Sequence, residues 1–177
     1  MENDRKRRRL YARKMKKILE VSPDFYTNHI AFFLDGVSFV HKYNAENVAR
    51  QPKARVWRRK SERLDFTAKG SKDLPEGRRL HLMVAVRFGN GVILRVAYEK
   101  MDGEFFENFI REHFNLCFGK AGPKTDGKRL FVMENCPCQT SRVALKALQD
   151  VECEVHKIPA RSPDLNPIEN IFHIVKV

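Results

Sequence analysis

A nine-residue stretch near the end of the chain, Ser162–Asn170, places a carboxylate on a rigid mount. Its two prolines, Pro163 and Pro167, preset the backbone φ angle where a loop would enter a helix. Glu169 follows in the first turn of that helix, between apolar residues that should face a core. A carboxylate held in this way either balances the positive end of the helix dipole or binds a cation.

Two other acids each close a short apolar run. Asp35 follows the run His29–Leu34 and precedes a glycine. Glu134 follows the run Arg129–Met133. Such runs are typical of strands buried on both faces of a sheet, so both carboxylates are predicted to lie where a strand leaves the core. Asp-Gly is also an ordinary turn signal, and Val37–His41 could then continue as a second strand beyond the turn.

The stretch Ser162–Asn170 resembles, almost letter for letter, the last catalytic motif of the Tc/mariner superfamily of DDE transposases. Two upstream segments agree. Phe33–Gly36 resembles the first-aspartate strand of the superfamily, and Met133–Pro137 resembles its Asp-Asn-x-Pro segment. Between Glu134 and Glu169 there are 34 intervening residues, the spacing that separates the second and third acids in that superfamily.

The resemblance implies a catalytic metal centre built from Asp35, Glu134 and Glu169, with Asn135 supporting it from the second shell. Such enzymes cleave and join DNA by in-line attack on phosphorus, and two divalent ions about 4 Å apart stabilise the attacking and leaving oxygens. Hard ions need oxygen ligands, so carboxylates from separate elements must converge. The implied cofactors are two Mg²⁺ or Mn²⁺ ions, and the implied partner is DNA, as transposon ends and as target.

Glu134 departs from the pattern, because the superfamily has aspartate there. The extra methylene shifts the carboxylate by more than the roughly 0.5 Å that a catalytic constellation tolerates, unless the backbone compensates. One hypothesis is therefore metal-dependent strand cleavage and transfer, weakened in this copy, and a second is an inactive DNA-binding relic. A third is another ribonuclease H-like nuclease, which would usually add a fourth carboxylate. Asp164 is the nearby candidate for it, although an aspartate there also forms turns or caps helices.

The elements that must position these acids follow a recognisable order. Those predicted besides the two acid-bearing strands and the last helix are a helix over 5–20, a β-hairpin over 81–98, a helix over 103–116, a helix capped by Thr140 or Ser141, and a strand over 152–158. An antiparallel hairpin joined to parallel α/β units is the ribonuclease H-like layout, an α/β fold whose mixed sheet carries helices on both faces. We expect residues 1–28 to form a basic helical segment, the end of a linker from a missing DNA-binding module. Residues 29–177 are expected to form the catalytic domain, truncated at its C-terminus.

The net charge of +12 is concentrated in two stretches. Residues 1–20 carry nine Lys or Arg against three acids, and residues 50–63 carry seven against one. This is the electrostatic footprint of a polyanion binder. The second stretch predicts a DNA-binding group with one stacking aromatic, made of Arg55, Trp57, Arg58, Arg59 and Lys60. The alternatives are solvated basic runs, a nuclear-import patch in the first stretch, and a core role for Trp57.

Length and composition allow one folded domain of 177 residues, 42% of them hydrophobic. No apolar run is long enough to cross a bilayer and the N-terminus lacks a secretory signal, so we expect a location inside the cell, in the nucleus if the organism is a eukaryote. A homodimer is left open. The four cysteines are too few and too unevenly spaced for a disulfide framework, and Cys136 and Cys138 stand too close for a zinc site. Buried thiols are the expected state of all four.

Overall fold

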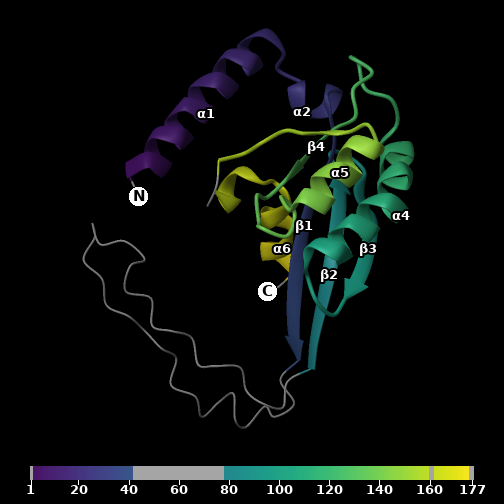
Figure 1. The fold of residues 1–177 in the computed structure, drawn as a ribbon. Coiled ribbons are helices and arrows are strands. Elements are labelled where there is room, and N and C mark those ends of the chain that lie inside the picture. Colours follow the sequence, from purple (N-terminus) through teal and green to yellow (C-terminus); the bar gives the residue numbers. More distant parts are fainter. Residues whose placement is uncertain (1, 42–77, 160–161, 176–177) are drawn as a thin grey trace, which may run out of the picture. The chain divides into compact units, whose positions relative to one another are not determined.

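The computed structural model describes residues 2–41, 78–159 and 162–175 (Figure 1). The chain divides into two units, one made of Met1–Val37 with His81–Val177 and the other of Ser38–Leu80. Each of the three predicted acids belongs to the first unit.

A five-stranded mixed sheet forms the centre of the fold, as predicted. Its strands are arranged in the order β3-β2-β1-β4-β5. The hairpin pair β2 and β3 is antiparallel, whereas β1 pairs with β4, and β4 with β5, in parallel. The bounds are β1 Ile30–His41, β2 Arg78–Arg87, β3 Gly91–Tyr98, β4 Leu130–Met133 and β5 Glu154–Val155.

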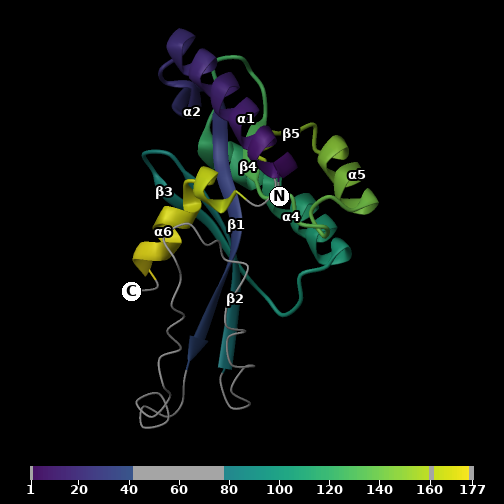
Figure 2. The ribbon, with the colours of Figure 1, turned by 90° about the vertical axis from the view of Figure 1, so that its left-hand side faces the viewer.

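Helices cover both faces of this sheet. Figure 2 shows α4 and α5 on one side of the strands and α6 on the other. The bounds of the described helices are α1 Glu2–Val21, α2 Phe25–Asn28, α4 Gly103–Ala121, α5 Arg142–Asp150, α6 Ile168–Val175 and the 3-10 turn η2 Pro163–Leu165. Ser141 caps α5 as expected, because its hydroxyl accepts a hydrogen bond from the Ala144 N–H.

The core between the sheet and α4 is aromatic. Phe32 of β1, Phe131 of β4 and Phe114 of α4 are fully buried. The Phe114 ring meets the other two edge-on, with centroid distances of 5.5 Å to Phe32 and 5.0 Å to Phe131. Each such edge-to-face pair contributes roughly 0.5–1.5 kcal/mol of stability beyond the contribution of the buried area itself. These contacts fix β1 and β4 side by side, and these strands carry two of the three acids.

The prediction that the first strand ends at Asp35, with a turn at Asp35-Gly36, is wrong, because β1 continues through both residues to His41. Gly36 is extended rather than left-handed, since it is not among the glycines with positive φ. What Gly36 provides is space. A Cβ atom at this position would meet the hydroxyl oxygen of Tyr98 at 3.0 Å. Val37–His41 therefore continue the first strand instead of forming a second one.

The prediction that all four cysteines are buried thiols is wrong for Cys136 and Cys138, which are joined by a disulfide. The reason is a tight turn after β4. The backbone N–H groups of Gln139 and Thr140 both donate to the Cys136 carbonyl, and the Cα atoms of the two cysteines lie 5.5 Å apart. Cys117 is a buried thiol as predicted, and Cys153 is a half-buried one.

Two element lengths also differ from the prediction. Helix α4 continues to Ala121 instead of ending at residue 116, and its last turns bury Cys117 and Ala121. Strand β5 is two residues long instead of seven, and Glu152 just before it has a positive φ of 54°. No described helix has the length and hydropathy that crossing a membrane requires.

Candidate active site

The register of the parallel strands places Asp35 next to Glu134. Leu34 of β1 pairs with Met133 of β4, so the two acids are the next residue along on neighbouring strands. Side chains alternate along a strand, so both point away from the face where Leu34 and Met133 join the aromatic core. That places both carboxylates on the α6 side of the sheet.

Glu169 approaches the same point from the first turn of α6. One carboxylate oxygen from each of Asp35, Glu134 and Glu169 lies within 4.8 Å of the other two. Three acids separated by 98 and 34 intervening residues in the sequence therefore converge. Among the described residues, no other group of three His, Cys, Asp or Glu side chains meets in this way.

Asp35 is the most buried member of the cluster, with 8% of its surface exposed. Its Oδ1 accepts a hydrogen bond of 2.7 Å from the Gly36 backbone N–H. Its Oδ2 is buried and has no hydrogen-bond partner within the described part of the chain. Burying such an oxygen without a partner is costly, so the arrangement favours a ligand that the carboxylate could bind.

The electrostatics of the cluster favour a cation. Burial, together with the nearby charges of Glu134 and Glu169, raises the pKa of Asp35 to about 7, against the opposing effect of the Gly36 N–H. Burial and the charge of Glu169 also raise the pKa of Glu134. Like charges held together destabilise one another unless a proton or a cation compensates them.

The donor set fits a divalent ion. Carboxylate oxygens are the ligands that Mg²⁺ and Mn²⁺ prefer, and two oxygens on opposite sides of one Mg²⁺ lie about 4.2 Å apart. The observed limit of 4.8 Å is close to that value, so small side-chain movements would close the cluster around an ion. The extra methylene of Glu134 does not remove its carboxylate from the cluster.

A cavity of about 440 Å³ opens beside Glu134. The residues that line it are Glu134, Asn135, Cys136, Pro137, Ile158, Pro159 and Ser162. Within this lining, the side-chain amide of Asn135 donates a hydrogen bond of 2.7 Å to the backbone carbonyl of Ile158. Asn135 thus ties the loop after β4, which follows Glu134 directly, to the segment after β5.

The segment that precedes Glu169 is bound by the N-terminal helix through Ser162 and Asp164. Arg8 of α1 binds both carboxylate oxygens of Asp164, at 2.8 and 2.6 Å, and its guanidinium also donates to the Ser162 hydroxyl at 3.2 Å. Asp164 lies in η2, just before α6. The Arg8 guanidinium lowers the pKa of Asp164. Nothing in the sequence identified this pair, because 155 residues separate its members.

The position of Asp164 bears on the alternative of a different ribonuclease H-like nuclease. That class usually adds a fourth carboxylate to the cluster, and Asp164 is outside the cluster and bound to Arg8. The five residues predicted to contact DNA, which are Arg55, Trp57, Arg58, Arg59 and Lys60, lie outside the described residues.

The fold and the three converging acids define a ribonuclease H-like domain of the nuclease and transposase class. A family model described as DDE superfamily endonuclease matches residues 45–177, and the chain belongs to that family. The predicted relation to the DDE transposases and endonucleases is thereby confirmed at the level of this family. No curated protein sequence matches the chain.

Solved structures of the Mos1 transposase share the fold. A pre-cleavage Mos1 transpososome matches with a TM-score of 0.66 at 18% identity, covering 99% of this chain and 50% of that one. A Mos1 paired-end complex with the left transposon end matches with a TM-score of 0.65 at 17% identity, covering 99% and 48%. A Mos1 mariner paired-end complex with Mn matches with a TM-score of 0.63 at 18% identity, covering 99% and 50%. The chain thus spans about half the length of these transposases.

Proposed function

We propose that this chain forms the catalytic domain of a DNA transposase of the Tc/mariner type, which cleaves DNA strands and joins the freed end to a target. The observation that carries the proposal is the meeting of Asp35, Glu134 and Glu169 within 4.8 Å, from three separate elements. Membership of the DDE superfamily endonuclease family and the fold shared with Mos1 transposase support it.

Each acid has a distinct part in this proposal. Asp35 is fixed by the Gly36 N–H through Oδ1, which leaves Oδ2 to bind a divalent ion. Glu134 and Glu169 are half-buried and supply the remaining oxygens from the rim of the cluster. Asn135 acts indirectly, by holding the loop that follows Glu134.

Divalent ions bound to these carboxylates would stabilise the attacking and leaving oxygens of an in-line displacement at phosphorus. Mg²⁺ or Mn²⁺ suits the oxygen-only donor set, and a Mos1 paired-end complex has been solved with Mn. Two ions are proposed, because one cluster must serve both oxygens of the reaction.

Glu134 supports a second candidate, a domain that binds DNA but has lost the chemistry. Its side chain is one methylene longer than the aspartate of the superfamily, and misplacement by about 1 Å can cost a hundredfold in rate. The two candidates predict different results for the same pair of proteins, the wild type and Glu134→Asp.

Nicking of supercoiled plasmid DNA in the presence of Mg²⁺ or Mn²⁺ tests the proposal, because one break per molecule is detected. We expect slow nicking by the wild type, nicking about a hundredfold faster by Glu134→Asp, and none by Asp35→Asn. If Glu134→Asp nicks DNA and the wild type does not, the second candidate is correct and the chain is a DNA-binding domain that has lost catalysis. If neither protein nicks DNA and neither binds Mn²⁺, the assignment of all three acids is wrong.

The proposal extends to partners and location. Transposon ends and target DNA are the expected partners, and the Mos1 structures include a complex with a transposon end. A homodimer would hold two ends together, and light scattering of the purified chain with and without DNA tests it. In a eukaryotic cell the site of action would be the nucleus, which imaging of a tagged chain would reveal.

A further inference from the structure

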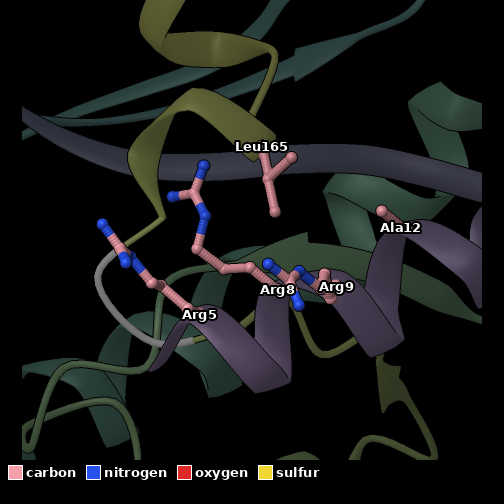
Figure 3. Close-up of a pocket in the computed structure, with 5 residues that line it drawn as sticks. All are labelled: Arg5, Arg8, Arg9, Ala12 and Leu165. Atoms are coloured by element: carbon pink, nitrogen blue, oxygen red, sulfur yellow. The ribbon is translucent and has the colours of Figure 1, made fainter. Parts of the chain in front are cut away.

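A second cavity, of about 410 Å³, lies between the N-terminal helix and the segment that carries the last acid (Figure 3). Arg5, Arg8, Arg9 and Ala12 line it from α1, and Leu165 lines it from η2. Arg8 and Arg9 lie three and four residues after Arg5, so both are neighbours of Arg5 on the helix surface. Among the residues that the structure describes, no acidic side chain lines the cavity.

The three arginines are not equivalent. Arg8 is occupied, because Asp164 binds its guanidinium through two hydrogen bonds. Arg5 and Arg9 are exposed, and no hydrogen bond or ion pair to either is found within the described residues. Arg8 therefore fixes α1 against η2, while Arg5 and Arg9 keep their charges available at the edge of the cavity.

The rest of α1 makes this geometry firm. Met15 is buried with 5% exposure, and the Tyr11 hydroxyl lies 3.1 Å from Nε2 of His156. The helix is thus attached to the catalytic unit at three points, through Arg8, Tyr11 and Met15. Two free guanidinium groups on a fixed helix are preorganised for an anion, whereas the same groups on a mobile tail would lose entropy on binding.

Position and lining indicate which anion. Leu165 belongs to the 3-10 turn that ends three residues before α6, whose first turn carries Glu169. Leu165 and Ala12 add apolar surface to the lining of the same cavity. A DNA strand presents phosphates at regular intervals with less polar sugars between them, so it suits a cavity lined by both guanidinium groups and apolar side chains.

We propose that Arg5 and Arg9 form a phosphate-binding site for a DNA strand whose path leads to the acidic cluster. The inference rests on the proposed function, since it assigns part of the substrate path to the same active site. The arginines contact the phosphates without reading the base sequence. Arg8 positions the helix and makes no contact with DNA.

The test is DNA binding without metal, so that it does not depend on catalysis. Fluorescence anisotropy with a labelled short duplex in EDTA compares the wild type with Arg5→Gln/Arg9→Gln between about 50 and 200 mM salt. Two lost phosphate contacts should reduce the slope of log affinity against log salt by about 1.8 and lower affinity by on the order of tenfold to a hundredfold near 100 mM salt. Arg5→Lys/Arg9→Lys should retain most of the slope, because the charges remain.

Arg7→Gln/Arg13→Gln is the matched control. Both arginines are exposed on α1 but do not line the cavity, so this variant removes the same charge from elsewhere on the helix. It should change the affinity much less. An equal loss in the two double variants, or no loss in either, would overturn the proposal. So would displacement of DNA by millimolar inorganic phosphate, since that would indicate a site for a free anion.

Failure of the two proposals can be told apart. If Arg5→Gln/Arg9→Gln loses DNA affinity while Mn²⁺ binding to the acidic cluster is unchanged, the phosphate site stands even if the wild type nicks no DNA. If the wild type nicks DNA and the variant binds and nicks as well as the wild type, the catalytic proposal stands and the phosphate site does not.

Discussion

Two aspartates in the same unit have pKa values shifted in opposite directions. Asp35 is buried beside Glu134 and Glu169, and its pKa is raised to about 7. Asp164 is exposed and accepts hydrogen bonds from Arg8, which lower its pKa. The Asp35 carboxylate lies beside two other carboxylates, whereas the Asp164 carboxylate is paired with the guanidinium group of Arg8.

The difference separates two uses of an acid. The charge of Asp164 is compensated within the chain, so this residue fastens α1 to η2. The charge of Asp35 is not compensated by any described Lys or Arg, and one of its oxygens is buried without a partner. A protein tolerates such a cluster where a ligand from solution completes it, which is why we assign the cation site to Asp35 and not to Asp164.

The largest predicted effect is on metal binding. Asp35→Asn removes the most buried ligand and should weaken Mn²⁺ binding by on the order of a hundredfold or more. Asp164→Asn removes a carboxylate that is already occupied and should leave Mn²⁺ affinity within about threefold, because its effect could only be indirect. Isothermal titration with Mn²⁺ measures both. Equal losses in the two variants would mean that the contrast between the aspartates is false.

The second prediction concerns the stability of the metal-free protein. The folded chain keeps the Asp35 proton up to a pKa of about 7, whereas the unfolded chain releases it near 3.8. Between these values the folded state binds more protons, so the free energy of unfolding should fall as the pH rises from about 4 to about 7 and then level off. The lowered pKa of Asp164 acts in the opposite sense and only below about pH 4, outside this window.

Thermal melts in EDTA across that pH range check this prediction. The wild type should lose several degrees relative to Asp35→Asn between about pH 5 and about pH 8, because the variant has no proton to lose there. Saturating Mn²⁺ should stabilise the wild type most at high pH, where the carboxylate is free to bind. Parallel curves for the two proteins would show that Asp35 does not titrate in this window.

Much of this site could be predicted from the sequence because each acid is marked by its local context. Asp35 and Glu134 follow apolar runs that are typical of buried strands, and Glu169 follows two prolines that indicate a helix start. The convergence of the acids was implied by the family resemblance, and the parallel pairing of β1 with β4 that brings two of them together was not predicted. The exact register, Leu34 with Met133, is set by core packing and could not be predicted locally.

The features that escaped prediction depend on contacts between distant residues. The crowding that favours glycine at position 36 comes from Tyr98, whose hydroxyl occupies the space that a side chain would take. The role of Arg8 depends on Asp164 at the other end of the chain. The dipeptide Asp-Gly occurs both in turns and at strand positions where another group closely approaches the glycine. The sequence alone does not distinguish the two cases.

The third prediction tests the space at Gly36. In Gly36→Ala the new Cβ atom would meet the Tyr98 hydroxyl at 3.0 Å, which should cost about 1 kcal/mol of stability. The strain falls next to the N–H that holds Asp35, so Mn²⁺ affinity should fall as well. Tyr98→Phe in the same chain removes the hydroxyl and should restore both. If the double variant is no better than Gly36→Ala, the Tyr98 contact is not what requires glycine.

The smallest predicted effect is the coupling between Arg8 and Asp164. Their side chains are 39% and 58% exposed, so solvent screens the ion pair, and a double-mutant cycle with Arg8→Gln and Asp164→Asn should give roughly 0.2–1 kcal/mol. Chemical denaturation measures this coupling, and salt should reduce it. The variants should retain Mn²⁺ binding, because the apolar anchor Met15 and the Tyr11 contact to His156 still hold α1 in place. A coupling of several kcal/mol would contradict this prediction. It would mean that the exposed pair of Asp164 and Arg8 is a major stabilising contact, and the proposed contrast between Asp164 and Asp35 would then be wrong.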